Sequence, residues 1–313
     1  MLRTFRAGDL PAYYDLMTGQ FPEEGRYLGW RREEFFRIVR RIDRIQYRLL
    51  FGFLNAIGRP LFRIFVLESD GALAGSALES FGEVSAYVAS VMVDPRFRRR
   101  GFARRLLDAC HALARRRRKK FVVLDVIDGN APALALYESL GYRPVGHGHL
   151  YVRPETAVSA PPGASSRVRE FRRSDGDPIA AVATSTVSPV RQGVHPVRAK
   201  EYSLATPVVR ALAAETAAWV VDAGAGPVAW VRASTSPATE AGHLSAPVVG
   251  PSADPADVRA LLLTAVEWNR SRGATRNVVE VWDENLPAIA ALRDVGFEVA
   301  YGVQTLAFPT GVP

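Results

Sequence analysis

The chain has 313 residues, of which 48% are hydrophobic and 23% charged. This composition is typical of a globular protein with one large domain or two ordinary ones. No uninterrupted apolar run reaches membrane-spanning length, and the first residues lack the apolar stretch of a secretory signal. A single cysteine, Cys110, excludes an internal disulfide and predicts a cytoplasmic protein without an integral membrane segment.

The positive charge is unevenly distributed along the chain. Residues 1–156 hold 26 Lys and Arg against 17 Asp and Glu, a net charge of +9. Residues 157–313 hold 14 against 15, a net charge of −1. An anionic partner is therefore expected to bind the first half.

The hydrophobic periodicity predicts a mixed α/β order in the first half. A short helix capped by Asp9 runs to about Thr18, and a longer helix covers residues 31–56. The elements expected after it are strands at 61–68, 72–80 and 84–93, a helix at 101–117, a strand at 121–127, a helix at 130–140 and a strand at 145–152.

An internal repeat predicts that the second half has the same order. At a constant offset of 155 residues, the segment 124–142 aligns without gaps with the segment 279–297, so that Asp125 meets Glu280 and Tyr142 meets Phe297. Helices are expected at 255–272 and 285–295. A segment rich in Pro, Ala and Ser separates the repeats, and the predicted domains are residues 1–153, a linker at 154–166, and residues 167–313.

One strand–turn–helix segment carries the residues that point to a chemical function. The predicted strand ends in Val91-Met92-Val93-Asp94-Pro95, and an arginine-rich turn with Gly101 opens the next helix. Unpaired backbone N–H groups and the helix dipole at such a turn attract phosphate. A solvated basic helix start is the alternative reading of the turn alone.

The wider pattern resembles the GNAT superfamily of acyl-CoA-dependent N-acetyltransferases. Its matching residues are the strand end just quoted, then Arg98, Gly101 and Ala103, then Asn130, Ala133 and Tyr137, then Gly141 and Tyr142. The resemblance implies two tandem α/β (α+β) units, each a mixed, mostly antiparallel twisted sheet flanked by helices. It also implies acetyl-CoA as co-substrate and a small-molecule or protein amine as acceptor, with no metal.

The resemblance assigns roles to particular residues. Tyr137 would act as general acid toward the departing thiolate, and the Val91 N–H would polarise the thioester carbonyl. Asn130 would bond the pantetheine arm, although it also serves as a helix cap. The residues expected to hold coenzyme A are Val91, Met92, Val93, Arg98, Arg99, Arg100, Gly101, Phe102, Ala103, Arg104, Asn130 and Tyr137.

The general base has no clear candidate in the first half. Glu79 on the preceding strand is one possibility, acting through water, and Glu83 and His149 are further possibilities. Each of them also has a plain reading as a surface or packing residue. The five histidines show no metal-ligand spacing along the chain, so no metal site is predicted.

The second half departs from the pattern, since Ala253 and Ala256 stand where the first has Arg98 and Gly101, and Leu292 replaces Tyr137. We therefore expect one working acyl-CoA site, in the first half. Two alternatives are an acyl-CoA-binding sensor without turnover and an enzyme similar to mycothiol synthase, in which the second copy works. No nucleic-acid partner is expected, because the run at 115–120 ends a helix, and the chain is expected to be a monomer or homodimer.

Overall fold

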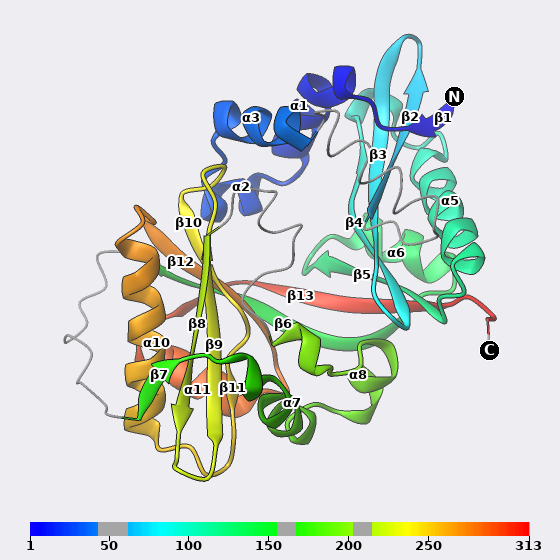
Figure 1. The fold of residues 1–313 in the computed structure, drawn as a ribbon. Helices are drawn as coiled ribbons and strands as arrows, with labels where there is room; N and C mark the ends of the chain where they lie inside the picture. Colours follow the sequence, from blue (N-terminus) through cyan, green and yellow to red (C-terminus); the bar gives the residue numbers. More distant parts are fainter. Residues whose placement is uncertain (43–61, 155–166, 203–214, 313) are drawn as a thin grey trace.

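The computed structural model describes residues 1–42, 62–154, 167–202 and 215–312 (Figure 1). In these ranges, none of the helices combines the length and the apolar character that a membrane crossing needs. The predicted linker at 154–166 lies almost wholly outside the described residues.

The first half follows the predicted order of elements closely. Its strand β5, Phe121–Ile127, has the predicted bounds, and the ends of the other predicted strands and helices after residue 61 differ by at most two residues. The elements are β1 Leu2–Thr4, the 3₁₀ helix η1 Ala7–Asp9, α1 Leu10–Gln20, α2 Pro22–Leu28, α3 Arg32–Ile42, β2 Phe62–Ser69, β3 Ala72–Phe81, β4 Ser85–Val93, η2 Pro95–Phe97, α5 Phe102–Arg116, β5, α6 Ala131–Ser139 and β6 Arg143–Pro154.

The second half repeats this order, as the internal repeat predicts. Its two predicted helices are α10 and α11, which begin within one residue of the expected positions. The elements are β7 Val168–Glu170, η3 Arg173–Asp175, α7 Gly176–Ser185, α8 Pro189–Val194, η4 Ala199–Glu201, β8 Glu215–Asp222, β9 Pro227–Thr235, β10 Ala241–Leu244, β11 Val248–Val249, α10 Pro255–Arg270, β12 Arg276–Trp282, α11 Leu286–Asp294 and β13 Glu298–Pro309.

The two halves exchange their last strands. The strand order is β1-β2-β3-β4-β5-β13-β6-β12-β10-β9-β8-β7, with β11 beside β9. Strand β13 of the second half thus pairs with β5 of the first, while β6 of the first half pairs with β12 of the second. The exchange joins the sheets of the two units into one, so that each half completes the sheet of the other.

Helices cover both faces of this sheet (Figure 1). In the first half α5 packs on β2, β3 and β4 over a core that includes Leu106, Leu107 and Cys110, all fully buried. Helix α1 lies against β3 and β4 from the opposite face. In the second half α10 and α7 take the corresponding positions. Cys110 is thus a small core residue.

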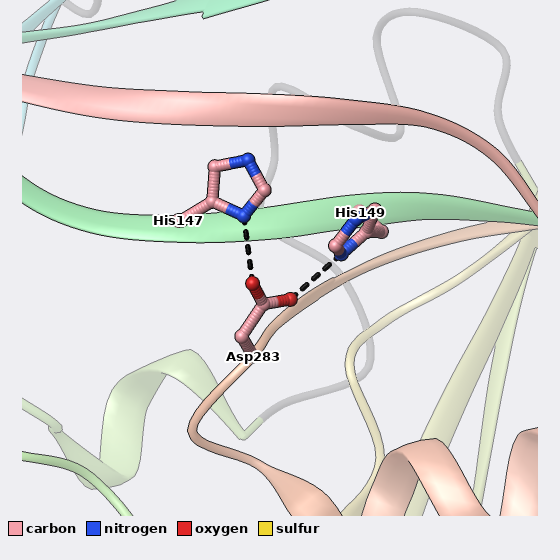
Figure 2. A group of neighbouring side chains, drawn as sticks. All are labelled: His147, His149 and Asp283. Atoms are coloured by element: carbon pink, nitrogen blue, oxygen red, sulfur yellow. Dashed lines mark hydrogen bonds and ion pairs between the residues drawn. The ribbon is translucent and has the colours of Figure 1, made fainter. Parts of the chain in front are cut away.

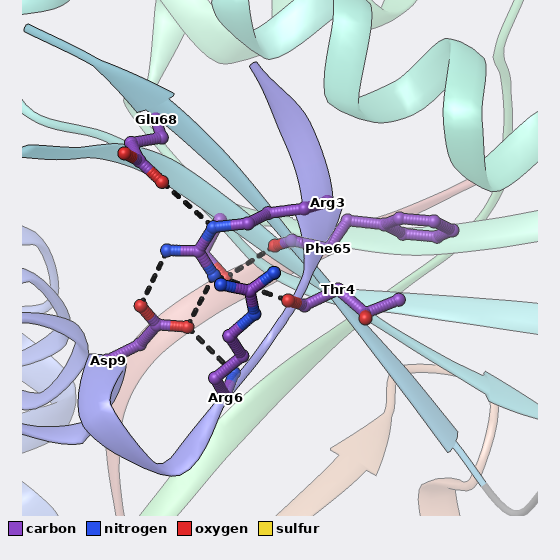
Figure 3. Close-up of polar contacts among 7 residues, drawn as sticks. Arg3, Thr4, Arg6, Asp9, Phe65 and Glu68 are labelled. Carbon is purple, nitrogen blue, oxygen red and sulfur yellow. Dashed lines mark hydrogen bonds and ion pairs between the residues drawn. The ribbon is translucent and has the colours of Figure 1, made fainter. Parts of the chain in front are cut away.

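Both halves also begin with the same arginine–carboxylate network. In the first, Arg3 on β1 makes two bonds of 2.7 Å to Asp9 and one of 2.9 Å to Glu68 on β2 (Figure 3). In the second, Arg169 bonds Asp175 and Asp222 in the same way. Each bidentate pair ties the first strand to the following turn, and its recurrence extends the repeat to the start of both halves.

The N-terminal region differs from the predictions in two respects, the cap at Asp9 and an additional helix. Asp9 occupies the position before α1, but its carboxylate bonds Arg3 and the backbone N–H of Arg6, and it makes no side-chain cap to the helix. Helix α2 was not predicted, and it begins at Pro22, a residue that suits the first position of a helix. The described part of the helix expected at 31–56 is α3, and residues 43–56 lie outside the described residues.

Candidate active site

Strands β4 and β5 are parallel neighbours only over their first four residues. The pairing runs from Ser85 opposite Phe121 to Val88 opposite Leu124. Beyond that point β5 continues beside β13 as far as Ile127, and β4 continues beside β3. The edge of β4 that carries Val91, Met92 and Val93 therefore has no strand on its β5 side in the described part of the chain.

A β-bulge lies within this unpaired stretch. Ser76 of β3 is opposite Met92, while Leu78 is opposite Ala89, so β4 holds one extra residue there. Ser90 has a φ of 51°, in the left-handed region that a serine seldom adopts. The bulge turns the backbone at Val91 out of the regular pleat, which is the kind of distortion that redirects an N–H group toward a ligand.

The arginine-rich turn links β4 to α5 and leaves the helix start uncapped. Gly101 precedes α5 with a φ of 74°, and Arg99 has a φ of 63°. Residues Arg98 to Gly101 are exposed, and within the described ranges no side chain caps the first turn of α5. The first N–H groups of a helix have no partner within it, so those of Phe102, Ala103 and Arg104 form a donor set at the positive end of the helix dipole.

The arginine side chains around the turn are held by different neighbours. Arg98 bonds Gln20 and lies 3.4 Å from the Val93 carbonyl oxygen. Arg104 donates to the Ser139 hydroxyl over 2.9 Å and so links α5 to α6. Arg100 lies over the ring of Phe97 at 5.4 Å. These contacts keep cationic groups on three sides of the uncapped turn.

The corresponding turn of the second half is closed by its own side chain. Asp254 precedes α10 and accepts a 2.8 Å bond from the Ala256 N–H, and Pro255 has no N–H to offer. At the offset of 155 residues, Asp254 corresponds to Arg99 and Ala256 to Gly101. A carboxylate thus occupies in the second half the place where the first half has open donors.

Asn130 caps α6 by accepting a 3.3 Å bond from the Ala133 N–H. Asn285 caps α11 in the same way, with a 3.4 Å bond to the Ala288 N–H. Recurrence in the second half gives Asn130 a structural use. Its side chain is exposed, whereas that of Asn285 is buried.

Tyr137 lies in the apolar cluster between α6, α5 and the open part of β4. It is only 6% exposed, and Val91, Phe102 and Ala133 pack on the same cluster. Burial raises the pKa of its hydroxyl to about 12, so it stays protonated near neutral pH. No described residue accepts a hydrogen bond from this hydroxyl, whereas the neighbouring Tyr142 hydroxyl lies 2.9 Å from His111 Nε2.

Glu79 occupies a different environment from the one expected of a base at a reacting centre. It is fully buried on the face of β3 that α5 covers, and neither carboxylate oxygen has a hydrogen-bond partner among the described residues. Burial raises its pKa to about 8, although the charges of Arg116, Arg117 and Arg63 act in the opposite direction. It therefore carries a proton in the folded protein at neutral pH.

We expect the Glu79→Gln variant to be more stable than the parent chain at alkaline pH. The folded pKa of about 8 lies above the ordinary glutamate pKa of 4.5, so the stability due to this carboxyl is full below pH 4.5 and is lost as the pH rises through 8. At about 1.4 kcal/mol per pKa unit, the loss is on the order of 4 kcal/mol. Urea unfolding at about pH 5 and pH 9 measures it, with the exposed Glu138→Gln as control. An equal effect of Glu79→Gln at both pH values would contradict this assignment.

A cavity of about 970 Å³ opens between the two halves beside the paired part of β4 and β5. At its floor, Asp125 accepts a 2.6 Å bond from the Tyr87 hydroxyl and a 2.5 Å bond from the Thr305 hydroxyl. Its charged and aromatic lining comes from both halves, namely Phe81, Glu83, Tyr87, Arg117, Lys119 and Asp125 from the first and Arg191, His195, Arg198, Lys200, Glu201 and Trp282 from the second.

Glu280 provides a further carboxyl group near this cavity. The sequence analysis did not identify it as a candidate base. Its side chain is exposed, yet the surrounding protein and the charge of Asp125 raise its pKa to about 7. The sequence feature that could have pointed to Glu280 was its alignment with Asp125 at the 155-residue offset. Glu83 differs from it, because hydrogen bonding to Lys200 and the nearby Arg198 lower the Glu83 pKa.

His149 lies away from this cavity, in a group that the sequence did not reveal. His147 and His149 stand two residues apart on β6, and both contact Asp283, which lies 134 residues beyond His149 in the chain (Figure 2). Only the strand exchange brings β6 beside β12 and so creates this group.

Comparisons with known proteins agree with this architecture. Residues 12–142 match the model of the acetyltransferase (GNAT) family. None of the curated proteins matches the chain. Among solved structures, the chain is similar to a tandem GNAT protein from the clavulanic acid biosynthesis pathway, at 16% identity and a TM-score of 0.66, with 99% of this chain and 98% of that chain covered.

Two further structures have the same fold over nearly the whole chain. A GCN5-related N-acetyltransferase from Sphaerobacter thermophilus is 16% identical with a TM-score of 0.64, covering 99% of this chain and 95% of that chain. A putative acetyltransferase from Pyrococcus horikoshii is 12% identical with a TM-score of 0.58, covering 100% and 90%.

The fold and the family match define an acyltransferase built from two repeated α/β units. Residues 12–142 are a domain of the acetyltransferase (GNAT) family, and the whole chain has the fold of the tandem GNAT protein. The predicted family, fold class and enzyme class are thereby confirmed.

Proposed function

We propose that the protein transfers an acetyl group from acetyl-CoA to a primary amine, and that its one working site lies in the first half. The observation that carries this proposal is that two sets of open backbone N–H groups, one on β4 and one at the start of α5, adjoin each other. The unpaired edge of β4 leads directly into the uncapped turn at the start of α5. An extended arm with a pyrophosphate at one end would match both at once.

Each part of coenzyme A has a proposed set of partners. The backbone from Arg99 to Arg104 would hold the pyrophosphate, with Phe102 and Ala103 presenting N–H groups and Gly101 leaving room for close approach. Arg98, Arg99, Arg100 or Arg104 would bind the remaining phosphate. Val91, Met92 and Val93 would pair with the pantetheine arm, and Asn130 would reach its amide.

The reaction would be a direct attack of the amine on the thioester carbon. The bulge at Ser90 supports the Val91 N–H as donor to the carbonyl oxygen as negative charge builds on it. When the C–S bond breaks, Tyr137 would give its proton to the departing thiolate, for which its protonated, unpartnered hydroxyl is suited. Solvent would then restore that proton.

The acceptor would bind in the cavity between the halves. The cavity adjoins the point where β4 and β5 diverge, and Asp125 in its lining offers a carboxylate to an amine, although Lys and Arg side chains outnumber the carboxylates there. Glu280 would take the proton of the amine, directly or through water, because its pKa near 7 allows it to accept a proton at neutral pH. Glu79, Glu83 and His149 stay as predicted alternatives without such support.

A pH profile of the Glu280→Gln variant tests the assignment of the base. The parent enzyme should show kcat/KM rising as the pH increases through about 7, as Glu280 loses its proton. The variant should lack this limb and lose about 100-fold or more of kcat/KM near pH 8. Exposed Glu298→Gln is the control. An unchanged profile in Glu280→Gln would remove it from the mechanism.

Release of coenzyme A from acetyl-CoA with a panel of amines tests the function itself. Turnover that depends on both acetyl-CoA and an amine is the expected result. Tight binding of acetyl-CoA without turnover on any amine would favour the non-catalytic sensor. Turnover that survives disruption of the first turn but not of the second would favour an enzyme similar to mycothiol synthase. The closed turn at Asp254 speaks against that reading.

A further inference from the structure

His147, His149 and Asp283 converge on one point at the seam between the halves (Figure 2). His147 Nδ1 lies 2.6 Å from one Asp283 oxygen, and His149 Nδ1 lies 2.7 Å from the other. The three ligand atoms lie within 4.8 Å of one another. Side-chain exposures of 37%, 28% and 45% leave the group open to an entering ion.

A second carboxylate adjoins this group. Asp128 approaches the outer side of His147, with its oxygens 3.0 and 3.2 Å from Nε2, so two carboxylates meet two imidazoles. In the described part of the chain, these imidazoles are the only ion-pair partners of Asp128 and Asp283. A divalent cation would match the charge of the two carboxylates.

We propose that His147, His149 and Asp283 bind a divalent cation of the zinc class. Two imidazole nitrogens and one carboxylate on a single ion are a donor set that zinc favours, with a fourth position left for water. Nitrogens about 2.0–2.1 Å from a tetrahedral ion stand roughly 3.4 Å apart, so side-chain rotations of about an ångström convert the hydrogen-bonded group into a ligand set.

Asp128 supplies the outer contact that a ligating histidine needs. When His147 binds an ion through Nδ1, its Nε2–H must be held by an acceptor, and Asp128 is in place for this. Gly302 makes room for that carboxylate, because a Cβ at this position would lie 1.9 Å from Asp128 Oδ2. The glycine thus permits the contact that fixes the ring of His147.

The ligands come from both halves, yet the pair of histidines occurs only once. Asp128 and Asp283 are related by the 155-residue offset, while the positions that correspond to His147 and His149 are Gly302 and Gln304. The site is therefore no by-product of the repeat. Because β6 carries the histidines and Asp283 follows β12, the ion would cross-link β6 of the first half to the end of β12 in the second.

Calorimetric titration of the chelator-treated full chain with Zn²⁺ tests the proposal. We expect one equivalent to bind with micromolar affinity or tighter and to raise the Tm, while Mg²⁺ at the same concentration does neither. His149→Gln should weaken Zn²⁺ affinity by more than about 100-fold, and Asp128→Asn by roughly 10 to 100-fold, as loss of an outer partner does. His195→Gln, which removes an exposed histidine elsewhere, should leave the affinity unchanged.

Co²⁺ provides a second readout that does not depend on stability. Its visible absorption should show tetrahedral nitrogen and oxygen coordination in the parent chain and should change in His147→Gln, with far-UV circular dichroism reporting that each variant is folded. Absence of stoichiometric Zn²⁺ binding would overturn the proposal. So would binding that both His147→Gln and His149→Gln leave intact.

Discussion

Replacing Tyr137 with phenylalanine should lower kcat by about 100-fold or more while leaving the KM for acetyl-CoA nearly unchanged, as expected for loss of a general acid. The substitution removes only the hydroxyl and keeps the ring in its apolar cluster. Because no described residue bonds that hydroxyl, stability should change little. Steady-state rates of thiol release and a thermal unfolding curve measure both effects.

Tyr142→Phe is the matched control for this substitution. The two rings lie 5.7 Å apart in the same cluster, but the Tyr142 hydroxyl is bonded to His111. Its loss should cost about 1–3 kcal/mol of stability by leaving a buried group unpaired, with kcat close to the parent value. A rate for Tyr137→Phe equal to that of the parent would remove Tyr137 as the acid.

Replacing Arg99 with aspartate should abolish acetyl-CoA binding, because it places before α5 the carboxylate that closes the corresponding turn before α10. Asp254, which corresponds to Arg99, caps its own helix over 2.8 Å. The new carboxylate would compete for the same N–H groups and repel the pyrophosphate. Loss of even two charge-assisted bonds, at about 1.5–3 kcal/mol each, predicts a rise in Kd of at least about 100-fold.

Two further variants distinguish the effect of capping the turn from the effect of a change in charge alone. Arg118→Asp makes the same change in charge at another exposed arginine with positive φ, at the far end of α5, and should leave Kd within a few-fold. Arg99→Gln removes the cation without adding an anion and should have an intermediate effect. If Arg118→Asp weakened binding as much as Arg99→Asp, the N–H groups of the turn would not be the phosphate site.

Local pattern was sufficient to predict most of the elements. Strand β5 could be read from its apolar run, and α6 from the Asn130 cap and Gly141, because these signals lie within the element itself. The repeat was visible over 124–142 and 279–297, where no insertion disturbs the register. The network of Arg3 and Arg169 escaped notice because these residues are 166 positions apart, so an ungapped comparison at 155 does not align them.

The strand exchange could not be predicted from the sequence. Alternation along β6 or β13 indicates which side chains face the core, but it does not say which strand lies alongside. Everything that depends on the exchange was missed with it, including the contact of His149 with Asp283 and the environment of Glu280. The burial of Glu79 could not be predicted for a related reason, since a glutamate in a strand favours the solvent face and here lies under α5.

The number of coenzyme A molecules bound per chain tests the central claim most directly. Calorimetric titration of the full chain with coenzyme A should give one equivalent, and Arg99→Asp should abolish it. Two equivalents, or a single one that Arg99→Asp leaves intact, would contradict a single working site at the open turn of the first half.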